Sequence, residues 1–124
     1  MKNIILFLLT LLLISCNNAT DPTVQIPSLP CNPIPTDGAI DQPCNLYLRW
    51  EYADTNYTVF DICFSSDSGM IEEDWMNTIV WRTEKNYVLM LGLEDSTTYY
   101  WQVVVEISNT EMAKGPIWKF ETGE

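Results

Sequence analysis

The fold of this 124-residue chain is decided by the stretch Leu93-Glu94-Asp95-Ser96-Thr97-Thr98-Tyr99-Tyr100-Trp101-Gln102-Val103. Its second half alternates, so that Tyr99, Trp101 and Val103 share one side of an extended chain and the residues between them share the other. Successive side chains of a β-strand point to opposite faces, and a period of two therefore predicts a strand with one buried face. The same parity continues to Val105.

Similar short runs, separated by turn-forming residues, occur on both sides of this strand. Working outward, the sequence predicts strands around Tyr87 to Leu93, Phe60 to Phe64, Leu46 to Trp50, and Trp118 to Phe120. Regularly spaced short strands are typical of an all-β sandwich or barrel. The residues expected to fill the core are Leu46, Leu48, Trp50, Phe60, Ile62, Phe64, Leu91, Leu93, Trp101, Val103, Val105 and Phe120.

The segment from Asp67 to Arg82 shows neither period clearly. We expect a loop there, with a short edge strand from Thr78 to Arg82 and no helix. Trp75 and Trp81 lie in this segment, and the simplest interpretation is that they close the open side of the sandwich.

Composition excludes several classes of function. The chain has 17 acidic and 6 basic residues, a net charge of −11 and no histidine. Without histidine, imidazole-based nucleophilic triads and imidazole zinc sites are excluded. The negative charge disfavours binding to nucleic acid through basic patches. We expect no catalytic residues, metal or cofactor, and an acidic monomer is the default.

The amino-terminal residues predict a targeting segment. Lys2 precedes an apolar run from Ile4 to Ile14, which is too short to span a bilayer but suits the core of a signal peptide. The next residues, in Leu13-Ile14-Ser15-Cys16, resemble the lipobox of bacterial lipoproteins. The resemblance implies removal of residues 1–15 by cleavage between Ser15 and Cys16, and acyl chains on Cys16 that anchor the protein to a membrane.

The residues after Cys16 predict a tether and suggest a location. Residues 16–30 are rich in proline and small polar residues, which indicates an extended linker, and residues 31–124 are the expected domain. Asn17 is not the aspartate that retains some lipoproteins in the inner membrane. The expected location is therefore the cell envelope of a bacterium, at the outer membrane.

The stretch from Leu93 to Val103 resembles the corner between strands E and F of a fibronectin type III domain. Leu93, Thr97 and Tyr99 match the family pattern, whereas Asp95 replaces its usual proline. The proline-rich start of the domain, the second and third strands and the closing strand also resemble the family, in its order. This resemblance implies an immunoglobulin-like antiparallel sandwich of about seven strands, with a tyrosine-corner hydroxyl at Tyr99 that returns to the upstream backbone.

Beyond Cys16, three cysteines remain. Cys31 and Cys44 lie symmetrically about a turn at residues 36–39, and if the two flanking strands pair they face each other and form a disulfide. The alternative is two unlinked cysteines. Cys63 has the opposite parity from Phe60 and Ile62, so we expect an unpaired thiol on the outer face of the sheet.

Three functional hypotheses follow. The first is a membrane-anchored, non-catalytic protein-interaction or spacer module, in which the loop Ser108 to Lys114 and the segment Trp75 to Trp81 serve as contact surfaces. The second is a glycan-binding module with Trp75, Trp81 and Tyr100 as stacking platforms. The third and weakest is a small hydrolase that uses a pair of carboxylates.

Overall fold

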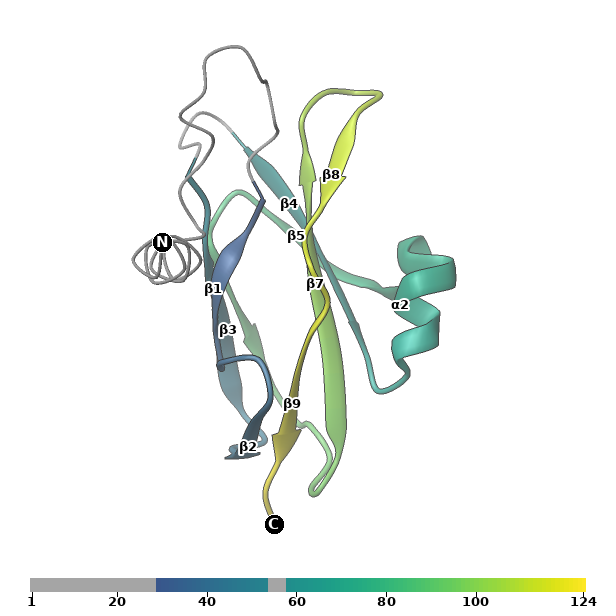
Figure 1. Ribbon diagram of the computed structural model, residues 1–124. Helices are drawn as coiled ribbons and strands as arrows, with labels where there is room; N and C mark the ends of the chain where they lie inside the picture. The colour runs from purple at the N-terminus through teal and green to yellow at the C-terminus, as the bar shows by residue number, and fades with distance from the viewer. Residues whose placement is uncertain (1–28, 54–57) are drawn as a thin grey trace, which may run out of the picture.

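The computed structural model describes residues 29–53 and 58–124, which form two packed β-sheets (Figure 1). The smaller sheet has the order β1-β3-β6, and the larger has the order β2-β9-β7-β4-β5, with β8 also paired to β7. The strands are β1 Cys31–Ile34, β2 Ala39–Gln42, β3 Leu46–Glu51, β4 Val59–Ser65, β5 Ile79–Thr83, β6 Tyr87–Met90, β7 Thr98–Glu106, β8 Met112–Lys114 and β9 Trp118–Thr122. This architecture confirms the predicted antiparallel sandwich.

The two ends of the domain each contribute two short strands. β1 pairs with β3 in the small sheet, whereas β2 pairs in parallel with β9 in the large one. β8 and β9 both lie antiparallel to β7 and are interrupted at Gly115-Pro116-Ile117. Because proline has no backbone N–H, it interrupts the ladder there. The structure describes nine strands where about seven were expected, because the strand at each end of the domain is divided into two short strands.

The core lies between the sheets and is lined by the predicted alternating faces. Leu48, Trp50, Ile62, Trp101 and Val103 are almost completely buried. Trp50 packs edge-on against Phe60, and its ring centroid lies 6.3 Å from that of Trp101. The large aromatic side chains of three strands thus fill the space between the layers.

One core prediction was wrong. Leu91 was expected to be buried, but its side chain is 66% exposed. β6 ends at Met90, and Val88 and Met90 occupy its inward face instead. Leu93 is half-buried and packs against the core from the loop that follows.

The segment from Asp67 to Arg82 was also predicted incorrectly in part. It forms the helix α2 Ser68–Asp74 and the 3-10 turn η1 Trp75–Thr78 before β5, where the edge strand was expected. The Asp67 side chain caps α2 by accepting the Gly69 N–H at 2.9 Å. A helix of seven residues has fewer than two turns, so its period cannot be recognised in the sequence.

Helix α2 covers the outer face of the large sheet, on the side away from β1 and β3 (Figure 1). Ile71, the buried residue of α2, packs with Cys63 of β4 and Val104 of β7. The outward parity of Cys63 was therefore predicted correctly, but the thiol is completely buried beneath the helix.

Candidate interaction surfaces

The corner that leads into β7 is held by its tyrosine. The hydroxyl of Tyr99 accepts the backbone N–H of Glu94 at 2.8 Å, which is the contact that the resemblance implied. Thr97 closes the turn by donating its hydroxyl to the Asp95 carbonyl at 2.7 Å. The Leu93 N–H donates to the Cys44 carbonyl at 2.9 Å and ties this corner to the turn that precedes β3.

The predicted disulfide between Cys31 and Cys44 is wrong. Cys44 is a free thiol that donates to Asp95 Oδ1 at 3.4 Å. Cys31 instead pairs with Glu51, at the far end of β3 from Cys44. At ~3.3 Å per residue, the length of β3 separates the two cysteines by about 20 Å, which is far beyond the reach of a disulfide. The symmetric spacing misled because β1 and β2 join different sheets.

The aromatic residues singled out from the sequence lie in two different places. Trp75 and Tyr100 are both half-buried and pack against the cluster beneath α2. Lys114 Nζ lies 4.8 Å from the centre of the Trp75 ring, and so covers one of its faces. Trp81 is 50% exposed and pairs directly with Ile62, which places it on the opposite side of the large sheet. The three rings therefore form no common platform.

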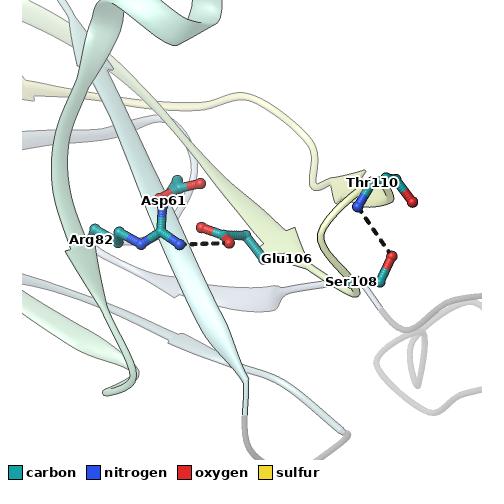
Figure 2. A network of polar contacts seen from close by, with 5 residues as sticks. All are labelled: Asp61, Arg82, Glu106, Ser108 and Thr110. Carbon is teal, nitrogen blue, oxygen red and sulfur yellow. Dashed lines mark hydrogen bonds and ion pairs between the residues drawn. The ribbon is translucent and has the colours of Figure 1, made fainter.

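Three charged side chains meet on the outer face of the large sheet, beside the Ser108 to Lys114 loop (Figure 2). Arg82 of β5 donates to Glu106 of β7 at 2.7 Å, and its other terminal nitrogen lies 3.9 Å from the Asp61 carboxylate of β4. The pKa of Asp61 is raised from 3.8 to about 6. Burial is the largest cause, the hydrogen bond and charge of the neighbouring Glu106 carboxylate add to the rise, and the Arg82 charge opposes it by a smaller amount. This cluster is engaged in holding three strands together.

The loop beside this cluster is ordered by its own hydrogen bonds. Ser108 accepts the Thr110 N–H at 3.3 Å through its hydroxyl and donates its own N–H to the Glu111 carbonyl at 3.1 Å (Figure 2). The loop is a tight connection between β7 and β8, and its residues 107–112 are exposed.

The outer face of the small sheet carries an exposed group that the sequence pattern did not bring together. We define the tyrosine–arginine face as the side chains of Ile34, Tyr47, Arg49, Tyr87 and Leu89. Tyr47 pairs with Leu89, and Arg49 pairs with both Ile34 and Tyr87. The outward parity of Tyr47 and Arg49 was readable, but the partners on β1 and β6 depend on strand pairing.

The tyrosine–arginine face is both apolar and open to solvent. Ile34 is 58% exposed, Tyr47 is 45% exposed and Leu89 is 39% exposed. Large exposed apolar side chains that are contiguous mark interaction sites more often than scattered ones do. This group is continuous across all three strands of the small sheet.

In residues 29–53 and 58–124, no group of three or more acidic or cysteine side chains is arranged to hold a metal ion. Among the residues that the structure describes, no helix has the length and apolar character that crossing a membrane requires. Ser15, Cys16 and residues 17–28 of the tether lie outside the described residues, whereas Leu29 is exposed and Pro30 is buried.

Comparison with known proteins supports the fold. No protein-family model and no curated protein sequence matches the chain. Among solved structures, it is similar to the fibronectin type III domain of human fibronectin type III domain containing protein 3, with a TM-score of 0.54. The two sequences are 15% identical, and the match covers 85% of this chain and 93% of that one. The fold is therefore that of a fibronectin type III-like β-sandwich.

Proposed function

We propose that this protein is a lipid-anchored protein of the bacterial cell envelope, in which the fibronectin type III-like domain serves as a non-catalytic protein-interaction module. The lipobox-like Leu13-Ile14-Ser15-Cys16 supports the anchor, and the proline-rich residues 16–30 support a tether that holds the domain away from the bilayer. A fold of this kind hosts many functions, so the proposal needs a surface as well as a fold.

The observation that carries the interaction role is the tyrosine–arginine face. Its tyrosines and arginine are among the residue types that contribute most binding energy at protein interfaces, and its exposed aliphatic side chains add apolar area around them. The face is built on paired strands, so its side chains are positioned before a partner arrives. The hydrolase alternative has no comparable support, because Asp61 and Glu106 are both engaged with Arg82.

The anchor is tested by the mass of the mature protein. The full chain is expressed in a bacterium, and the protein in the membrane fraction is weighed intact. We expect a mass that begins at Cys16 and includes acyl groups, and we expect the Cys16→Ala variant to leave the membrane fraction. A wild-type protein that carries no acyl groups and is found in the soluble fraction would overturn the proposed anchor.

The interaction role is tested by cross-linking in the cell. A photoreactive amino acid is placed in the full chain at Tyr47, at Leu89 or at Lys119, which lies exposed on β9 of the other sheet. We also place it at Trp81 to sample the segment singled out from the sequence. We expect protein adducts from positions 47 and 89. If none of the four positions gives a protein adduct above background, the module does not act through protein contacts.

A further inference from the structure

The tyrosine–arginine face holds a guanidinium in a prearranged position. The Arg49 guanidinium carbon lies 4.9 Å from the centre of the Tyr47 ring and 5.4 Å from that of Tyr87. The two rings meet edge-on, with centroids 5.9 Å apart. Contact with two rings limits the rotamers of a long side chain, and so reduces the entropy that it loses on binding a ligand.

Among the residues that the structure describes, no carboxylate lies within ion-pair distance of this guanidinium. In the part of the chain that the structure describes, both ion pairs within 4.0 Å involve Arg82, and none involves Arg49. Glu51 lies two residues further along the outward face of β3 but forms no ion pair with Arg49. An unpaired, exposed arginine is notable in a chain with 17 acidic and 6 basic residues.

A second cation borders the same face. Lys85 Nζ lies 5.6 Å from the centre of the Tyr87 ring, so the rings are flanked by two positive charges. The chain as a whole is strongly acidic, with a net charge of −11. The face therefore contrasts in charge with the molecule that carries it, and it attracts an anionic group over the short range that salt allows.

We propose that the tyrosine–arginine face binds a protein partner through a segment in which a carboxylate side chain is flanked by apolar side chains. The planar guanidinium of Arg49 offers paired N–H donors that match a carboxylate. Ile34 and Leu89, exposed on either side, offer contacts to the flanking apolar groups. This inference rests on the proposed interaction role and specifies its site and the chemistry of the partner.

A peptide segment fits this face better than a broad anionic surface does. A membrane or an anionic polysaccharide presents many negative charges at once, and these are repelled by the net charge of −11. A short segment places one carboxylate on Arg49 and buries apolar groups on the side chains around it. The carboxylate on Arg49 thus supplies a local charge match, and the apolar groups beside it supply the buried contact area.

The experiment selects binders from a phage-displayed library of short random peptides, using the purified full chain in detergent. The peptides that are enriched are then synthesised, and their affinities are measured for the wild type and for Arg49→Glu. Lys119→Glu reverses an equivalent exposed charge on the other sheet and is the matched control. Circular dichroism and tryptophan fluorescence verify that all three proteins are folded.

We expect enriched peptides that combine Asp or Glu with apolar residues. Their affinity should fall by about thirty-fold in Arg49→Glu, as for a central arginine at an interface, and should be unchanged in Lys119→Glu. Replacing the acidic residue of the peptide by its amide should cause a loss of similar size. No enrichment, enriched peptides without a carboxylate, or equal affinity for Arg49→Glu would overturn the proposal.

The cross-linking experiment separates failure of this inference from failure of the proposed function. If adducts to proteins form in the cell but persist in Arg49→Glu, the protein-interaction role stands and the role of Arg49 is refuted. If no protein adducts form at any position, the interaction role itself is refuted.

Discussion

At the scale of single residues, one hydroxyl fastens the corner before β7. Tyr99 accepts the Glu94 N–H, and its ring stacks on Phe64 with centroids 4.9 Å apart. Tyr99→Phe keeps the ring but leaves the Glu94 N–H without this acceptor. Because this hydrogen bond is exposed and water can replace the acceptor, we expect the free energy of unfolding, measured with urea, to fall by about 0.5 to 1.5 kcal/mol.

The control for this substitution is Tyr47→Phe, which removes an exposed hydroxyl on the small sheet. Its effect should stay within about 0.5 kcal/mol. If Tyr99→Phe is as mild as the control, the hydrogen bond to Glu94 does not stabilise the corner.

A second residue-scale prediction concerns Asp61, whose pKa is raised from 3.8 to about 6 chiefly by burial. The folded state then binds the proton more tightly than the unfolded state does, so this contribution to stability is greatest at low pH and is lost as pH rises from about 4 to 6. We expect the stability of Asp61→Asn, relative to the wild type, to increase across this window, because the amide has no charge to bury.

Urea unfolding at a series of pH values measures this difference. Lys119→Ala changes one charge elsewhere on the same sheet and controls for the overall charge of the molecule. A stability difference between Asp61→Asn and the wild type that is flat from pH 4 to pH 6 would show that Asp61 is as well solvated as an ordinary surface carboxylate.

At the scale of elements, α2 is held to the large sheet mainly by Ile71, whose side chain is 1% exposed against Cys63 and Val104. Ile71→Ala leaves a cavity at this contact. We expect it to lower the free energy of unfolding by about 2 to 4 kcal/mol in urea titrations. Met70→Ala, on the exposed side of the same helix, should cost far less.

Helix α2 also covers the Cys63 thiol. In the wild type, α2 buries it completely, and burial is the main reason that its pKa is raised. An equal loss of stability in Ile71→Ala and Met70→Ala would mean that α2 does not pack on the sheet in the way described.

At the scale of the whole molecule, the two hydrophobic clusters lie on opposite faces of one sheet. The first fills the sandwich, and the second lies beneath α2, with β4 and β7 contributing to both. Because they share these strands, we expect them to unfold together in a single two-state transition. Tryptophan fluorescence and far-ultraviolet circular dichroism should give coincident urea curves, and an early circular dichroism change would contradict this.

What the sequence alone determined was local. Alternation identified most of the strands and their buried faces, because the period of a strand is a property of neighbouring residues. The resemblance of Leu93, Thr97 and Tyr99 to the fibronectin type III pattern identified the corner. The sequence did not predict α2, because this helix is too short for a helical period to show.

Only the tertiary structure decided which distant residues meet. It separated Cys31 from Cys44 by assigning β1 and β2 to different sheets, and it placed Arg82 between the carboxylates of two other strands. It also set Tyr87 opposite Arg49. Strand order and register are set by burial summed over the whole molecule, so the proposed binding face cannot be derived from any single stretch of the chain.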